Sequence, residues 1–140
     1  MITFREAYIT DAHVVAKNLR TTDAHGFTAE SLRVTIEASD VAHAGEVDGE
    51  VAALFGIIDE SHGLERRGAC WLATTEVMQR NALTFARLSR PVWAEMRQGW
   101  DQIRGCYPAA EKNAAIWLRS LGFEVGGDVH GHRLFLWRAS

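Results

Sequence analysis

Residues 111–123 read EKNAAIWLRSLGF, and this stretch decides the fold of the 140-residue chain. Four apolar residues recur in it at the spacings of one helical face: Ala114, Trp117, Leu118 and Leu121. Gly122 follows directly, where the end of a helix favours a residue that tolerates a positive φ. Phe123 then opens an extended segment. The stretch therefore predicts a short amphipathic helix that ends at a glycine and leads into a strand.

Two turn signals predict antiparallel strand pairs. Asp48-Gly49 lies between two apolar runs within residues 41–58, and such a pair favours a two-residue hairpin because both turn positions take a positive φ. A second turn, at residues 130–132, separates the last two extended segments, 123–129 and 133–138, and predicts a terminal hairpin.

Helical patterns fill the intervals between strands, at residues 12–19, 28–39 and 76–104. The third contains a stripe at helical spacing, Trp93, Met96, Trp100 and Ile103. Pro91 is expected either to divide this helix or to lie in the first turn of one that restarts near Ser89. The remaining extended segments are residues 2–8, 68–75 and 105–110, of which the second is typical of a buried central strand.

The resulting order is strand, two helices, three strands, helix, strand, helix and two strands. Helices alternate with strands, and the two hairpins require antiparallel neighbours. The sequence therefore predicts one α+β domain over residues 1–140, with a mixed, mostly antiparallel sheet flanked by helices.

Composition argues against several classes of function. The formal net charge of −3 disfavours a nucleic-acid-binding surface. No apolar run approaches the ~20 residues that span a bilayer, and the first residues lack the apolar core of a signal peptide. We expect a cytoplasmic protein with neither a nucleic-acid nor a membrane partner. Cys70 and Cys106 lie in apolar surroundings and are expected to be reduced and buried.

The helix that ends in Leu-Gly-Phe resembles the end of the GCN5-related N-acetyltransferase (GNAT) fold, and so does the stretch from Trp71 to Thr75 after a glycine-containing turn. The closer resemblance is to the acetyltransferase-like internal virion and capsid-assembly proteins of T7-type tailed bacteriophages. The likeness in element order covers most of the chain, and the motifs cover its second half. The resemblance implies acetyl transfer from acetyl-CoA to an amine, in the cytoplasm of a host cell, or a place in a virion.

The resemblance also implies a CoA site. The central strand and the strand at residues 105–110 are expected to splay into a V-shaped opening for the pantetheine arm. The family's glycine-rich pyrophosphate loop corresponds to the frame Gln79-Arg80-Asn81-Ala82-Leu83-Thr84, which lacks the glycines. Side chains there disfavour the positive φ that aims backbone amides at a phosphate, so we expect a degenerate loop and weak or lost binding. The candidate cofactor-binding residues are Leu72, Ala73, Thr74, Gln79, Arg80, Asn81, Ala82 and Asn113.

Acetyl transfer also needs proton-transfer groups. Many relatives place a tyrosine acid four residues before the glycine of the last helix, and Leu118 occupies that position here. A general base is a group whose pKa lies near neutrality, and Glu76, just past the central strand, is the candidate. Its alternative role is that of a carboxylate favoured by the dipole of a helix N-terminus. His130 and His132 alone do not make a zinc site, which needs three protein ligands, so no metal is expected.

Two functions stay open from the sequence. The first is an acyl-CoA-dependent N-acetyltransferase that acts on a small-molecule or protein amine. The second is a non-catalytic GNAT-like phage protein that serves in virion assembly or another interaction, as a homodimer or with an assembly partner. The fold favours the first, whereas the altered loop and Leu118 favour the second.

Overall fold

The computed structural model describes residues 1–19 and 27–140, with the side chains of residues 112 and 113 left undescribed. Its elements are, in order, β1 (Ile2–Glu6), α1 (Asp11–Ala16), α2 (Ala29–Ala38), β2 (Ser39–Val47), β3 (Glu50–Asp59), β4 (Arg67–Thr74), α3 (Glu76–Arg80), α4 (Ala82–Met96), β5 (Gln102–Pro108), α5 (Lys112–Ser120), β6 (Glu124–Val129) and β7 (His132–Arg138). This order confirms the predicted α+β class.

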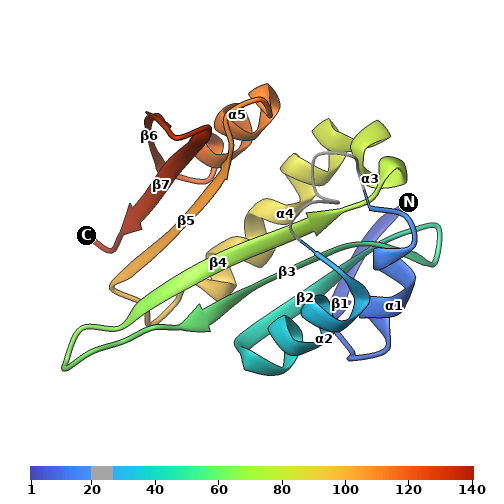
Figure 1. Cartoon of the computed structure of the whole chain (residues 1–140), viewed down its shortest axis with the longest axis horizontal. Coiled ribbons are helices and arrows are strands. Elements are labelled where there is room, and N and C mark those ends of the chain that lie inside the picture. The colour runs from blue at the N-terminus through green and yellow to red at the C-terminus, as the bar shows by residue number, and fades with distance from the viewer. Residues whose placement is uncertain (20–26) are drawn as a thin grey trace.

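The seven strands form one twisted sheet in the order β1-β2-β3-β4-β5-β7-β6 (Figure 1). Every neighbouring pair is antiparallel except β4 and β5, which run parallel. The predicted mixed, mostly antiparallel sheet is therefore confirmed. Because the hairpin of β6 and β7 folds back onto β5, the last third of the chain builds one wing of the sheet.

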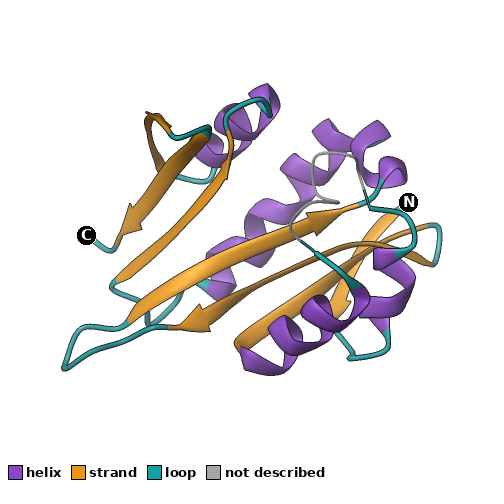
Figure 2. Cartoon of the chain, viewed as in Figure 1, coloured by secondary structure: helices purple, strands orange, loops and turns teal. Residues whose placement is uncertain are grey.

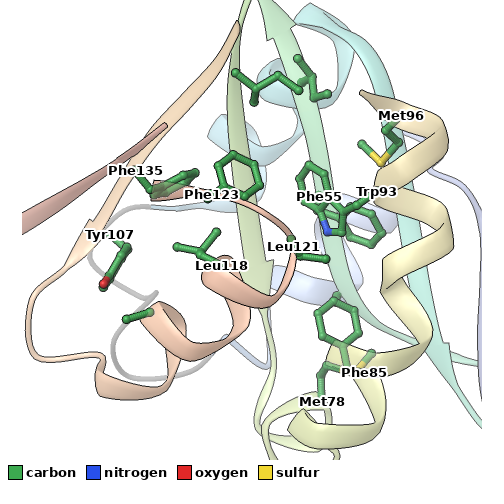
Figure 3. Packing of buried hydrophobic residues seen from close by; sticks show 14 of the residues in the cluster. Phe55, Met78, Phe85, Trp93, Met96, Tyr107, Leu118, Leu121, Phe123 and Phe135 are labelled. Atoms are coloured by element: carbon green, nitrogen blue, oxygen red, sulfur yellow. The ribbon is translucent and has the colours of Figure 1, made fainter. Parts of the chain in front are cut away.

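Helices cover both faces of the sheet (Figures 1 and 2). On one face, which we call the α1–α2 face, Val15 and Leu32 pack on Leu54 and Ala73. The other face, the α4–α5 face, carries the larger core. There a run of aromatic rings passes from β3 through α4 to β7 (Figure 3): Phe55 and Trp93 at 5.5 Å, Trp93 and Phe123 at 6.3 Å, and Phe123 and Phe135 at 5.2 Å between centroids.

Both predicted turns are present. Asp48 and Gly49 have φ values of 50° and 87°, and Val47 pairs with Glu50 on either side of them. His130 and Gly131 have φ values of 54° and 83° between β6 and β7. Two successive residues with positive φ match the right-handed twist of the flanking strands, as the sequence argument required.

The last helix has the predicted phase. Leu118 and Leu121 are buried, and Ala114 and Trp117 are partly buried against the same core. Ala115, which was not in the predicted set, is buried as well. Gly122 has a φ of 94°, and the amide of Phe123 donates to the carbonyl of Leu118 at 3.0 Å. This is the bond that closes a helix at a left-handed glycine.

The predicted helix at residues 76–104 is wrong in three respects. It divides at Asn81 rather than at Pro91, which lies inside α4. Pro91 is tolerated there because it and residue 87, whose carbonyl loses its partner, are both on the exposed side of the helix. The helix ends at Met96, and Gly99, with a φ of 84°, turns the chain. Trp100 is therefore buried from a turn, and Ile103 from β5.

Other boundaries shift by a few residues. The first helix covers Asp11–Ala16 instead of residues 12–19, and β5 covers Gln102–Pro108 instead of 105–110. None of the helices in the described part of the chain is long and apolar enough to cross a membrane.

Candidate functional site

The parallel strands β4 and β5 pair only at one end. Their register comprises Arg67 with Gln102, Gly68 with Ile103, and Ala69 with Arg104. Beyond these pairs the two strands diverge, so they form an open V (Figure 1). The predicted splay is therefore confirmed. We call the Ala69–Arg104 pair the apex, and the end of β4 near Thr75 the mouth.

The inner edge of β4 presents backbone rather than side chains to the V. Over residues 70–73, no strand in the described ranges pairs with this edge, while the other edge pairs with β3. Leu72 packs toward the core of the α4–α5 face and Ala73 is buried in that of the α1–α2 face. Thr74 is also buried. Of these candidate residues, Leu72 and Ala73 can therefore offer main-chain groups to an extended ligand.

The expected pyrophosphate frame is helical. Gln79 and Arg80 end α3, Asn81 joins the helices, and Ala82 begins α4. Asn81 has a φ of −112°, and no described residue between Thr75 and Met96 has a positive φ. The amide of the Asn81 side chain donates to the carbonyl of residue 77 at 2.9 Å and does not cap α4. Residues 79–84 therefore present to an anion the backbone amides in the first turn of α4, which no side chain caps, and not the amides of a glycine-rich loop.

Glu76 lies at the mouth of the V. It is exposed in the first turn of α3, directly after Thr75, whose hydroxyl accepts from the amide of Met78 at 3.4 Å. At ~3.3 Å per strand residue, it is roughly 20 Å from the apex. Asn113 lies in the first turn of α5, and its side chain is outside the described part of the structure. Glu76 and the apex are therefore not brought together.

Leu118 is 3% exposed within the larger core. A tyrosine that the sequence argument did not consider is Tyr107, on β5. Its ring packs at 6.2 Å from that of Phe135, and its buried hydroxyl has no hydrogen-bond partner among the described residues (Figure 3). An acid was considered only on the last helix, whereas Tyr107 reaches the core from a strand.

A cavity of about 620 Å³ lies beside the apex. Its lining includes Ala69, Arg104, Cys106, Glu124, Leu134 and Leu136. On β5, Ile103 and Tyr107 face the larger core, so the alternate residues Arg104 and Cys106 face the opposite side, the α1–α2 face. No described helix covers that face of β5 and β7 (Figure 2). We call this concave surface the trough.

The trough has an apolar floor and charged ends. Cys106 is exposed, contrary to the expectation that both thiols are buried, and Leu134 is 58% exposed beside it. The Arg104 guanidinium donates to the Glu60 carboxylate at 2.9 Å. Cys70 faces the core instead, and burial raises the pKa of its thiol. Cys106 is exposed because no described helix covers its face of β5 and β7 (Figure 2).

The remaining titratable groups do not converge. His130 lies in the final turn and His132 at the start of β7, and both are exposed. Within the described ranges, no three metal-binding side chains cluster. His43 stacks on Phe55 at 5.9 Å, and its buried Nδ1 has no partner among the described atoms. Burial lowers the pKa of His43, while Glu95 and Glu6 act in the opposite direction.

The fold is shared with known acetyltransferases. No protein-family model and no curated protein matches the chain. Among solved structures, a GNAT-family acetyltransferase from Streptococcus pneumoniae matches with a TM-score of 0.72 at 12% identity, over 100% of both chains. The yncA protein of Salmonella typhimurium, solved with acetyl-CoA, matches with a TM-score of 0.74 at 16% identity, over 99% of this chain and 94% of its own.

A third structure is the ribosomal-protein-S18-alanine N-acetyltransferase from Escherichia coli. It matches with a TM-score of 0.71 at 15% identity, over 100% of this chain and 95% of its own. These matches cover 99–100% of this chain and 94–100% of the matched chains. The protein therefore has the GNAT acetyltransferase fold.

Proposed function

We propose that this protein is an N-acetyltransferase that transfers an acetyl group from acetyl-CoA directly to an amine. The observation that carries the proposal is the V between β4 and β5, whose inner β4 edge is left open over residues 70–73. Unpaired backbone groups need hydrogen-bond partners, and the two amides of a pantetheine arm supply them in an extended chain. The likeness to a structure solved with acetyl-CoA supports acetyl-CoA as the cosubstrate.

The cosubstrate is proposed to lie with its thioester near the apex and its pyrophosphate at the mouth. Ala82 would meet the phosphates through the first turn of α4, where helix amides and dipole favour an anion. Gln79 and Arg80 at the end of α3, and Asn81 between the helices, would add their side chains. Asn113, in the first turn of α5, is proposed to contact the same ligand. One helix N-terminus offers fewer donors than a glycine-rich loop, so we expect weak binding.

The reaction needs two proton transfers. The amine nitrogen attacks the carbonyl carbon of the thioester, so a C–N bond forms and the C–S bond breaks. One ammonium proton passes to a base before attack, and a second leaves the nitrogen as the thiolate becomes the CoA thiol. Glu76 is proposed as the base, and because it lies roughly 20 Å from the apex it would take the proton through intervening water molecules rather than from the bound amine directly. Leu118 offers no proton, so water is the proposed donor to the thiolate.

The alternative function is a non-catalytic one. The resemblance to T7-type phage proteins, the helical frame at residues 79–84 and Leu118 favour a protein that retains the fold and serves virion assembly or another interaction. On this alternative the V is a remnant, and acetyl-CoA does not bind. Phage origin and packaging into a virion belong to this alternative proposal.

Thermal unfolding with acetyl-CoA tests the proposal, because a ligand that binds only the folded state raises Tm. We expect acetyl-CoA to raise Tm and the N-acetylated product of an added amine to be detected by mass spectrometry. The matched variant is Ala82→Glu, since a carboxylate in the first turn suits the helix dipole but repels a pyrophosphate. It should fold at least as stably as the wild type and lose most of the shift. No shift and no product at millimolar ligand would favour the non-catalytic alternative.

A further inference from the structure

We propose that the trough is the acceptor site and that it takes a primary amine with an apolar body. This inference rests on the proposed acetyl transfer and names the substrate class for it. The trough is the cavity of about 620 Å³ on the α1–α2 face of β5 and β7. Such a volume is typical of sites for small molecules.

Position is the first argument. Ala69 and Arg104 form the last pair of β4 and β5, and both line the trough. The trough therefore adjoins the point where the two strands separate. On the α4–α5 face, the rings of Trp93, Phe123 and Phe135 fill the space behind the strands (Figure 3). An acceptor can thus approach a thioester at the apex from the trough side.

The floor of the trough is the second argument. Cys106, Leu134 and Leu136 come from paired positions on β5 and β7, because Cys106 pairs with Leu134 and Arg104 with Leu136. Leu134 is 58% exposed, which leaves a concave apolar surface open to solvent. An aryl or alkyl group would remove this surface from water. A small hydrophilic amine has nothing to bury there.

Charge is the third argument. Among the described residues Glu60 is paired with Arg104 at 2.9 Å, whereas Glu124 is exposed and has no ion pair. Glu124 lines the trough beside the apolar floor. One unpaired carboxylate at an apolar surface complements one ammonium group on an apolar body. Because Arg104 and Glu60 neutralise each other, Glu124 is the one uncompensated charge among the described lining residues, which matches a monoamine better than a polyamine.

Protection of Cys106 from alkylation tests binding independently of catalysis. Cys106 is exposed on the floor, and Cys70 serves as internal reference because burial raises the pKa of its thiol. The probes are 2-phenylethylamine and ethanolamine, which carry one ammonium each. Alkylation of each thiol by iodoacetamide is followed by mass spectrometry. We expect 2-phenylethylamine to slow alkylation of Cys106, and ethanolamine at the same concentration to have little effect.

Variants connect this protection to the trough. Leu134→Gln should remove most of the protection, and Glu124→Gln should weaken it. Val34→Gln is the matched control, since Val34 is a partly exposed aliphatic residue on α2. In acetylation assays, kcat/KM for 2-phenylethylamine should exceed that for ethanolamine by about tenfold or more. Leu134→Gln should bring the two kcat/KM values closer together.

Each outcome has a consequence. Acetylation of 2-phenylethylamine without protection of Cys106 would overturn the trough as acceptor site and leave the proposed function standing. Protection without product would support an apolar-amine site and overturn the proposed function. Equal protection by both amines would overturn the proposed substrate class. A dimer that shields Cys106 without any amine, and that dissociates with Leu134→Gln, would make this surface an interface between copies and overturn the proposal.

Discussion

The contact between Gly105 and Phe135 gives the sharpest test of the larger core. A Cβ at Gly105 would stand 2.4 Å from Cζ of Phe135, with two other ring carbons at 2.9 and 3.0 Å. The ring cannot withdraw freely, because Phe123 packs on it edge-to-face at 5.2 Å and Tyr107 lies at 6.2 Å. We expect Gly105→Ala to lower the free energy of unfolding by about 2–3 kcal/mol, in the upper part of the range for overpacked cores.

The matched control is Gly127→Ala, on β6. Nothing lies within 4 Å of a Cβ at Gly127, so this change should be neutral or stabilise by about 0.4–1 kcal/mol. Urea unfolding of both variants gives the two free energies by linear extrapolation. Gly105→Ala combined with Phe135→Leu should cost less than the sum of the single changes, because the shorter side chain relieves the clash. A Gly105→Ala loss below about 0.5 kcal/mol, or strict additivity, would refute the packing argument.

Three further outcomes are expected. Trp117→Ala should cost about 3 kcal/mol in urea unfolding, the lower end for aromatic truncation, because the ring is only partly buried although it contacts Phe85 at 5.8 Å; a loss near zero would mean that the ring is not packed. Burial lowers the pKa of His43 in the folded state, so the unfolded state binds the proton more readily and stability should fall as pH drops below about 6.5, the ordinary pKa of histidine. His43→Phe should remove this part of the pH dependence, and an unchanged pH profile would contradict it. Glu76→Gln should lower kcat by about 10²–10⁴ if Glu76 is the base, and an unchanged kcat would leave Glu76 the structural role of a first-turn carboxylate.

Local chemistry explains which parts of the fold could be predicted. The turns at Asp48-Gly49 and at Gly122 depend on φ values that few residues tolerate, so sequence alone places them. The helix prediction at residues 76–104 fails for the opposite reason. Trp100 and Ile103 continue the helical spacing by coincidence, and both are buried from a turn and a strand instead. Gly99 was the local signal that should have ended the helix.

The candidate site depends on contacts between distant parts of the chain. Cys106 is exposed because no described helix covers its face of β5 and of β7, the strand that pairs with β5 from beyond α5 in sequence. Strand alternation assigns Arg104, Cys106 and Tyr107 to their faces only once one of them is known to face the core. The trough therefore has no signature in the sequence of β5 alone. The splay of the V was predictable only through the resemblance to a known fold, because no residue pattern marks where parallel pairing stops.

Leu118 does not by itself decide between the two functions. A thiol has a pKa near 8.5, so CoA leaves as a comparatively stable thiolate, and protonation of the leaving group is less demanding than for an alkoxide or an amide nitrogen. Loss of an acid at Leu118 therefore lowers the rate without removing the reaction. Binding is the stricter requirement, since attack needs the thioester and amine held together at the apex. Because strand pairing ends at Ala69 and Arg104, the open backbone edge of β4 and the trough lie side by side. Measuring the binding of acetyl-CoA and of the amine therefore distinguishes an enzyme from an assembly protein more directly than a substitution at Leu118 does.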